Sequence, residues 1–440
     1  MTRMIILTVA GVLFSQPARS QSDTESDSLL QDATLQNCVR YALVHRPLLR
    51  QSSLDEEITE RAISSKLADW FPQLNFYGSI QHNPQLPTSI VGSNLARIGQ
   101  ANSANGEFSV TQTLFNREVL LASSTAHTER NLVRQLKVGN QIDVVIAVSK
   151  AYYAALATRQ QIGVLDEAME RLELTLKEAY AQYKAGVVDK TDYQRATISL
   201  NNVRAENRQA LNLLQARYAS LKEQMGYPPA AALELEVDST QMEQEALLDT
   251  TQSVNLQTRI EYQLLQTRRQ LQEANLDYAR WSFLPSLNAF GNYTLNYQNS
   301  EMSRLFLHNY PYSSVGLQFS FPIFESGKRV QDIKQAELEL ERIDYDVISL
   351  RNAVNAEYTQ ALTNYKSNLD NYFVLKENVA LARDVYRTIQ LQYKAGIKSY
   401  LELIVAETDL RSAQDNEVDA LYQVLVSKLD LQKALGTVQY

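Results

Sequence analysis

Residues that break regular backbone are scarce in this chain of 440 residues, which holds only 14 glycines and 10 prolines. So few turn formers argue against a loop-rich fold, such as a dinucleotide-binding α/β enzyme or a sandwich of many short strands. A single cysteine excludes a disulfide scaffold and a cysteine zinc site. The net charge is −8, whereas nucleic-acid binders carry an excess of basic residues, so we expect no nucleic-acid partner.

Motifs of catalysis and cofactor binding are also missing from the sequence. The four histidines are scattered without metal-ligand spacing, so no metal site is expected. Gly327-Lys328 lacks the upstream glycine and the downstream Ser or Thr of a phosphate-binding loop. The G-x-S-x-G turn of a serine hydrolase does not occur. We therefore expect a protein that is not an enzyme and that holds no cofactor.

Residues 1–20 have the pattern of a secretory signal peptide. Arg3 supplies a positive charge, Met4–Phe14 is an apolar run, and small residues precede a cleavage site before Gln21. The run is too short to cross a bilayer as a helix, and the alternative of a buried N-terminal helix leaves the flanking charge and cleavage site unexplained. Cys38 lies well past the predicted cut, so we expect export without a lipid anchor. No later stretch approaches the roughly 18 apolar residues that a transmembrane helix needs.

Two long segments without proline, 88–227 and 323–440, predict long helices. Between Leu340 and Tyr393, apolar residues advance by threes and fours in a near-heptad seam. A helix from about Lys328 to Tyr393 is about 100 Å long at about 1.5 Å per residue, which a compact globular core does not need. The predicted hairpins run from Arg117 to Tyr183, turn at Gly186 and resume to Met225, and from Lys328 to Tyr393 with a turn at Gly396. Local bends are expected at Gly139 and Gly163.

The chain contains an internal repeat. The segment Tyr183-Lys184-Ala185-Gly186-Val187 matches Tyr393-Lys394-Ala395-Gly396-Ile397 at an offset of 210 residues. Upstream, the Phe-Pro-Gln-Leu-Asn at 71–75 matches the Leu-Pro-Ser-Leu-Asn at 284–288 at nearly the same offset. Chance similarity between amphipathic helices would not keep the turns and prolines in step. The expected organisation is a first repeat over 21–230, a linker over 231–250 and a second repeat over 251–440.

Each repeat also contains two segments in which apolar and polar residues alternate, about 72–82 and 107–115 in the first and about 286–298 and 313–323 in the second. Alternation over about ten residues is typical of transmembrane β-strands, although a soluble amphipathic sheet has the same period. Four strands cannot close a barrel, and open edges are not tolerated in lipid. If these strands contact outer-membrane lipid, several chains must share one barrel. The segments 83–105 and 299–311 are then outward loops.

Several short motifs, in this order, resemble the TolC-like outer-membrane efflux protein family. The opening Thr34-Leu35, Ala42-Leu43 and Arg46-Pro47-Leu48-Leu49 is similar to the family's first helix. The Leu-Pro-x-Leu at 284–287 and the Pro-Ile-Phe at 322–324 resemble its strand boundaries. The Tyr-x-x-Gly at 183–186 and 393–396 resembles its hairpin tips, and the closing Ala434-Leu435-Gly436 also fits. The resemblance covers essentially the whole mature chain.

This resemblance implies a mainly α fold with a β-barrel contribution. Long α-helical hairpins would build a periplasmic tunnel, and four transmembrane β-strands per protomer would join a 12-stranded barrel in a homotrimer. The implied function is a passive exit duct in the outer membrane of a Gram-negative bacterium, within a tripartite efflux or type I secretion system. The implied partners are a periplasmic adaptor and an inner-membrane pump or ABC exporter. Ducts for drugs, metals or proteins fit equally, because the pump selects the cargo.

The resemblance also implies a periplasmic gate at the hairpin tips. In the family, an acidic residue six past the first tip glycine bonds to a tyrosine and a basic residue near the second tip. These positions are Asp192, Tyr393 and Lys398 here, and a carboxylate can accept from both a phenol and an ammonium group. Solvated surface charges are the alternative, worth about 0–1 kcal/mol as an exposed pair.

A second part of the implied gate is an acidic ring six and nine residues past the second tip glycine. Glu402 fits the first position, and Val405 departs from the pattern at the second. In a trimer, three copies of Glu402 would favour cations and raise one another's pKa, unless this residue is an ordinary surface glutamate. The expected adaptor contacts at the tips are Lys184, Gly186, Val187, Lys394, Gly396 and Ile397.

A periplasmic coiled-coil scaffold without a barrel is the competing interpretation. It explains the long helices but leaves the four alternating segments without a role. Extraction from the outer membrane only with detergent would favour the duct, whereas a soluble periplasmic pool would favour the scaffold.

Overall fold

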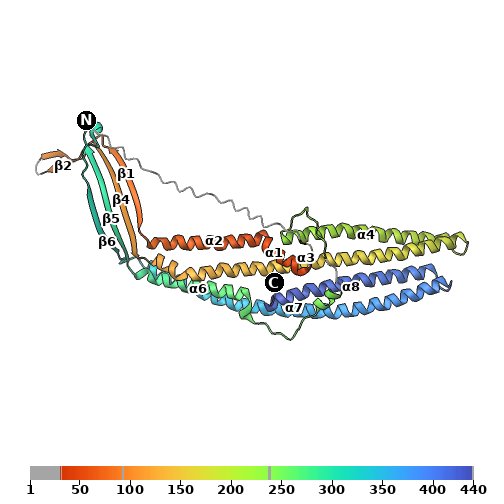
Figure 1. The fold of residues 1–440 in the computed structure, drawn as a ribbon. Helices are drawn as coiled ribbons and strands as arrows, with labels where there is room; N and C mark the ends of the chain where they lie inside the picture. Colours follow the sequence, from red (N-terminus) through yellow and green to blue (C-terminus); the bar gives the residue numbers. More distant parts are fainter. Residues whose placement is uncertain (1–29, 31, 92–93, 236–238, 439–440) are drawn as a thin grey trace.

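The computed structural model describes residues 30, 32–91, 94–235 and 239–438. The predicted signal peptide lies outside these described residues and stays a prediction. The molecule is elongated, with a sheet at one end and two helical hairpins that reach the other end (Figure 1). In chain order the elements are α1 Leu35–His45, α2 Pro47–Leu67, η1 Ala68–Trp70, β1 Gln73–His82, β2 Thr88–Val91, β3 Asn94–Arg97, β4 Asn102–Phe115, α3 Arg117–Lys184, α4 Lys190–Met225, α5 Ser239–Ala246, η2 Leu256–Thr258, α6 Ile260–Arg280, η3 Trp281–Phe283, β5 Ser286–Asn299, η4 Met302–Arg304, β6 Tyr312–Ser320, α7 Lys328–Lys394 and α8 Tyr400–Leu435.

The two halves of the chain contain matching elements of nearly equal length. Helices α2 and α6 have 21 residues each, α3 and α7 have 68 and 67, and α4 and α8 have 36 each. In both halves two strands of the main sheet lie between the 21-residue helix and the long helix. The predicted hairpins are therefore confirmed to within a residue at the ends of α3 and α7. The exact repeat and linker boundaries stay a prediction.

Helix α3 continues through both of its internal glycines. Gly139 and Gly163 lie within a single helix of 68 residues, and a Cβ atom built on either meets nothing within 4 Å. The predicted helix-weakening glycines thus do not interrupt the helix, because packing along its length outweighs a local cost of about 1 kcal/mol each.

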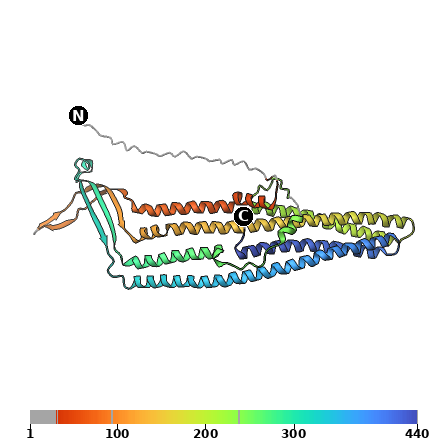
Figure 2. The same cartoon turned by 60° about the horizontal axis from the view of Figure 1, so that its bottom comes forward.

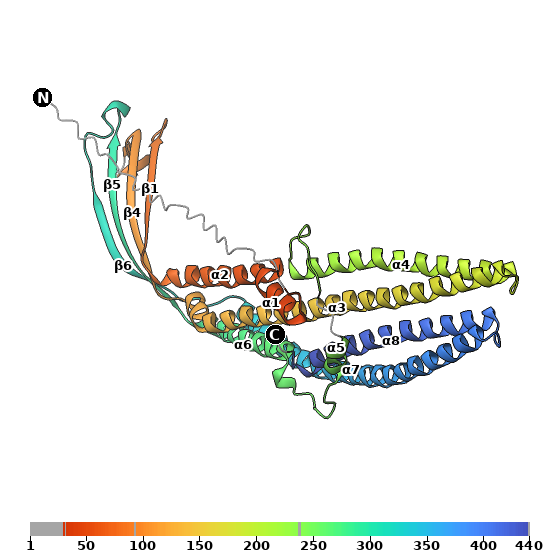
Figure 3. The same cartoon turned by 45° about the vertical axis from the view of Figure 1, so that its right-hand side comes forward.

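The apolar seam of α7 faces its neighbours as predicted. All the seam positions between Leu340 and Tyr393 are buried or half-buried, and Tyr365, Tyr372 and Tyr386 are among the fully buried ones. Helix α7 lies beside α8, and α3 lies beside α4 (Figure 3). The largest apolar core forms near the middle of the molecule, where α1, α3, α7, α8 and the segments 231–235 and 242–248 meet.

The main sheet is antiparallel with the order β1-β4-β5-β6, so strands from both halves pair at its centre (Figure 1). Its register places rows of apolar side chains on one face and rows of mainly polar side chains on the other. Leu74, Val110, Gly291 and Val315 lie in one row across the four strands. The next row is polar and contains Asn75, Ser109, Asn292 and Ser314, with Ser109 Oγ donating to Asn292 Oδ1 at 2.7 Å.

Three details of the strands differ from the predictions. Strand β4 begins at Asn102 rather than near 107, and the segment expected to be an outward loop contains the short hairpin β2–β3 (Figure 2). Strand β6 ends at Ser320 rather than near 323, because Pro322 has no N–H to donate to a neighbouring strand. Phe290, the apolar residue on the polar face, places its ring over Gly316 of β6, where a Cβ would lie 2.9 Å from the ring.

In the described part of the chain, no helix combines the length and the apolarity that crossing a membrane requires.

Candidate functional site

Both hairpin tips lie at the end of the molecule opposite the sheet and have the same backbone (Figures 1 and 2). Gly186 has φ +75° and Gly396 has φ +77°, in the left-handed region that glycine adopts without a Cβ penalty. The following residues, Val187 and Ile397, each donate at 2.9 Å to a carbonyl five positions back. This pattern is the Schellman motif, so both helices end on glycine for the same local reason.

The predicted adaptor-contact residues are all exposed at this end. Val187 and Ile397 are 72% exposed, unusually high for aliphatic side chains. Lys394 forms an ion pair of 3.4 Å with Glu178 of α3, which ties the second tip to the first hairpin. Lys184 places its ammonium 5.6 Å from the centre of the Tyr180 ring. The tips thus present two apolar side chains flanked by lysines.

Tyr393 is buried between the two hairpins rather than bonded to Asp192. Its phenol donates to Gln182 Oε1 of α3 at 3.2 Å, and its ring packs edge-on against Tyr400. Burial, and then the nearby charge of Asp192, raise the pKa of Tyr393. Asp192 is therefore within electrostatic reach of this phenol from the first turn of α4.

Lys398 pairs with Glu402 within the second tip. Lys398 Nζ donates to Glu402 Oε1 at 2.5 Å, and the backbone N–H of Ser399 donates to Glu402 Oε2 at 3.0 Å. Ser399 and Glu402 form a capping box at the start of α8. These bonds lower the pKa of Glu402 to about 2, opposite to the rise expected from repulsion within an acidic ring. Within one chain the structure thus brings Lys398 to Glu402 and not to Asp192.

Further charged residues join the two hairpins above the tips. Arg171 of α3 donates to Glu407 of α8 at 3.2 Å, and Arg411 of α8 donates to Glu206 of α4. The sequence contains only a weak sign of them, the spacing of Glu407 and Arg411 by one helical turn. Nothing local in the sequence indicates a partner more than 200 residues away.

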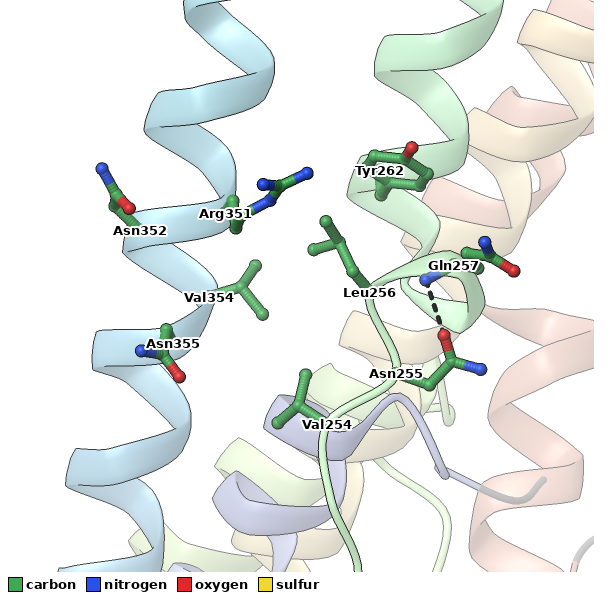
Figure 4. A pocket seen from close by; sticks show the side chains of 9 residues that line it. All are labelled: Val254, Asn255, Leu256, Gln257, Tyr262, Arg351, Asn352, Val354 and Asn355. Atoms are coloured by element: carbon green, nitrogen blue, oxygen red, sulfur yellow. Dashed lines mark hydrogen bonds between the residues drawn. The ribbon is translucent and has the colours of Figure 1, made fainter.

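A hollow of about 540 Å³ lies far from the tips, between the segment around η2 and α7. Figure 4 shows Leu256 and Tyr262 on one side and Arg351 and Val354 on the other, with Asn255 Oδ1 accepting from the backbone N–H of Gln257 at 3.0 Å. None of the predicted site residues lines it. Within the described ranges, no cluster of three or more His, Cys, Asp or Glu side chains is arranged to hold a metal ion.

Comparison with known proteins identifies the family. The model of the outer membrane efflux protein family matches residues 39–227 and 253–437, which together make up most of the chain. The chain belongs to the outer membrane efflux protein family. Its two matched segments contain the two hairpins, and the unmatched segment between them includes α5.

Individual relatives agree with this membership. Outer membrane protein TolC of Escherichia coli is 23% identical over 427 residues, covering 93% of this chain and 84% of TolC. The toluene efflux pump outer membrane protein TtgC of Pseudomonas putida is 24% identical, and the match covers 92% of this chain and 83% of TtgC. The crystal structure of the outer membrane protein VceC of Vibrio cholerae has a TM-score of 0.74 at 16% identity, covering 92% of this chain and 97% of VceC.

These findings confirm the main expectations from the sequence. The protein is an outer-membrane efflux channel of a Gram-negative bacterium, with a helical hairpin region and a β-sheet region. A periplasmic scaffold without membrane strands is not supported. The relatives are channel proteins rather than enzymes.

Proposed function

We propose that three copies of this chain form one passive exit duct. Each copy contributes four strands to a twelve-stranded barrel in the outer membrane, and its hairpins to an α-helical tunnel through the periplasm. The duct receives its cargo from an inner-membrane pump or ABC exporter, joined through a periplasmic adaptor protein. The energy comes from the pump that delivers the cargo.

The observation that supports this assembly most directly is the sheet. Within the described residues, β1 and β6 each pair with only one neighbour, so each leaves one edge open. Exposed apolar side chains cover one face, including Leu74 and Phe76 of β1 and Val315 and Leu317 of β6. In lipid, the backbone groups of an open edge must find partners, and β6 of one copy can pair with β1 of the next.

Cysteine cross-linking tests the shared barrel. In a Cys38→Ser background, one cysteine is placed in β1 and one in β6, at several register positions. Oxidation of the outer-membrane protein is expected to produce a ladder that ends at three chains. As a control, cysteines replacing Asn292 and Ser314, which are paired within one chain, are expected to link without a change in mass. Cross-linked species that stop at one chain would overturn the shared barrel.

The proposed gate consists of Asp192, Tyr393 and Lys398 at the tips. Two observations support it: the charge of Asp192 acts on the buried Tyr393 phenol, and Lys398 lies within two residues of the tip glycine. In the trimer, we propose, Asp192 of one copy pairs with Lys398 of the next. Asp192→Ala with Lys398→Ala is expected to raise the single-channel conductance in a planar bilayer, and an unchanged conductance would overturn this gate.

We also propose that Glu402 forms one acidic ring around the tunnel axis. Its pKa of about 2 keeps the carboxylate ionised at neutral pH, which suits a cation-selective constriction. Because Lys398 offsets part of this charge, the ring is weaker than three free carboxylates. Glu402→Gln is expected to lower the cation selectivity, measured as the reversal potential in a salt gradient. Equal selectivity would exclude the ring.

The exposed tips are the proposed adaptor-binding surface, made by Lys184, Gly186 and Val187 of the first hairpin and Lys394, Gly396 and Ile397 of the second. Photo-cross-linking residues in place of Val187 and Ile397 are expected to capture an adaptor in cells. The same residue in place of Val315, on the sheet at the opposite end, should capture none. Equal capture at both ends would contradict this surface.

A further inference from the structure

Two ion pairs link the hairpins in a reciprocal arrangement above the tips. Hairpin one, made by α3 and α4, supplies the cation Arg171 and the anion Glu206. Hairpin two, made by α7 and α8, supplies the anion Glu407 and the cation Arg411. Arg171 donates to Glu407 and Arg411 donates to Glu206, so each hairpin holds one charge of each sign against the other.

Burial distinguishes these pairs from the other contacts between the hairpins. The side chain of Glu407 is 3% exposed, that of Arg411 is 18% exposed and that of Arg171 is 20% exposed. Nearer the middle of the molecule, Lys150 pairs with Asp430 and Lys433 with Asp143, but these side chains are 35–62% exposed. Exposed pairs are screened by water and salt, whereas a buried charge depends on its partner.

The surroundings of the two pairs fix them in place. The guanidinium of Arg171 lies 5.7 Å from the centre of the Tyr386 ring, and Leu403, Ala406 and Leu410 are buried on the same helix as Glu407. Burial raises the pKa of Glu407, while Arg171 and Arg411 oppose the rise. Among the described residues, the Nε atoms of Arg171 and Arg411 have no acceptor. The two ion pairs therefore have defined partners but leave two buried N–H donors unsatisfied, so they do not give the greatest stability that this interface could have.

The geometry makes the two pairs interdependent. Glu407 and Arg411 lie one helical turn apart on α8, so a displacement of α8 away from hairpin one separates both pairs at once. Each separation leaves a buried charge of α8, Glu407 or Arg411, without its partner on hairpin one, which strongly disfavours intermediate positions, although Arg171 keeps its ion pair with Glu167. The hairpins are thus either joined here or apart far enough for water to reach these charges.

We propose that Arg171–Glu407 and Arg411–Glu206 form a latch that holds the two hairpins together in the closed duct and breaks when the tunnel opens. The latch is distinct from the tip residues, since Glu407 lies seven residues beyond Tyr400, where α8 begins, about 10 Å along the helix at about 1.5 Å per residue. Its gating role rests on the proposed function, whereas its role in joining the hairpins does not.

The test compares Glu407→Gln, which removes the charge with little change in shape, with the wild-type trimer in detergent and in planar bilayers. Hydrogen exchange of the backbone amides at 403–411 is expected to speed up about tenfold. Single-channel conductance is expected to rise as well. The milder Glu206→Gln, at a half-exposed carboxylate, is expected to shift both measurements in the same direction and by less.

Two further variants distinguish the effect of leaving a buried charge unpaired from a general loss of stability. Arg171→Met with Glu407→Leu replaces a buried ion pair by apolar side chains, and is expected to return exchange and conductance to wild-type values or lower. Arg204→Gln removes an exposed pair with Glu173 inside hairpin one and is expected to change neither measurement.

Unchanged exchange in Glu407→Gln would overturn the latch. Faster exchange with wild-type conductance would refute its gating role and leave a purely structural link between the hairpins. A wild-type protein that forms no conducting channel would instead overturn the proposed function. The exchange measurement, which needs no channel, would still decide whether these ion pairs join the hairpins.

Discussion

The guanidinium of Arg259 closes the carboxyl end of α8, donating at 2.9 Å to the main-chain carbonyl of Ala434. The same nitrogen donates to the carbonyl of Lys433, and the other nitrogens pair with Glu261 and Glu357. The last carbonyls of a helix have no partner within the helix, and here a buried cation supplies one. One side chain thus ties α6, α7 and α8 together near the middle of the molecule.

Replacing Arg259 is therefore expected to weaken the fold. Its side chain is 4% exposed, and Arg259→Met leaves two carbonyls and two carboxylates without their donor. We expect the free energy of unfolding to fall by about 3–5 kcal/mol, measured by urea titration with circular dichroism. In the control Arg280→Met, a side chain that is 54% exposed loses two long ion pairs, at a cost of about 1 kcal/mol or less. Equal losses in the two variants would contradict this role.

Two glycines with nearly equal backbone angles are expected to respond differently to alanine. Gly226 has φ +69°, and a Cβ there would lie 2.9 Å from the carbonyl oxygen of His45 and 3.0 Å from Cα of Arg46. Gly186 has φ +75°, but a Cβ there meets nothing within 4 Å. Gly186→Ala should therefore cost only the left-handed strain of about 1–2 kcal/mol. Gly226→Ala should cost clearly more, because rigid backbone must move, and thermal melting in detergent compares the two.

The long elements could be predicted because their signals are local. The apolar seam between Leu340 and Tyr393, and the glycines at 186 and 396, each require only neighbouring residues to be interpreted. Alternation of apolar and polar residues likewise located the four strands of the main sheet. The predicted end of β6 is too late because the apolar run continues past Pro322, although proline removes the N–H that a strand needs.

The contacts between hairpins could not be predicted, because they depend on how distant helices pack. Tyr393 meets Gln182 across 211 residues, and Arg171 meets Glu407 across 236. A heptad pattern states which face of a helix is buried but not which residue lies opposite. Lys398 is an example of this limit. The carboxylate that it contacts is Glu402, which lies one helical turn further along the chain at the start of α8.

The first turn of α8 is expected to lose stability as the pH falls. The pKa of Glu402 is lowered to about 2 from an unfolded value of about 4.5, chiefly by the bond from Lys398 and then by the Ser399 N–H. A lowered carboxyl pKa stabilises the folded state above the unfolded pKa, and this stabilisation is lost as the pH falls toward about 2. Amide exchange at 399–403, corrected for intrinsic rates, should therefore lose protection between about pH 4.5 and about pH 2. Glu402→Gln keeps an acceptor for the Ser399 N–H but loses the charge, so it should show weaker protection at neutral pH and respond little to acid, whereas an equal response would contradict the assignment.

Neighbouring residues of β6 provide a direct test of which face of the sheet meets lipid. Val315 is 87% exposed and lies in the apolar row with Gly291, whereas Ser314 lies in the polar row with Asn292. A lysine on the lipid face costs about 2–4 kcal/mol near the middle of the bilayer, but one facing the water-filled interior costs little. Val315→Lys is thus expected to reduce the amount of folded protein in the outer-membrane fraction. Ser314→Lys should insert normally and instead lower the preference of the channel for cations. If both variants inserted equally well, the apolar row would not face lipid.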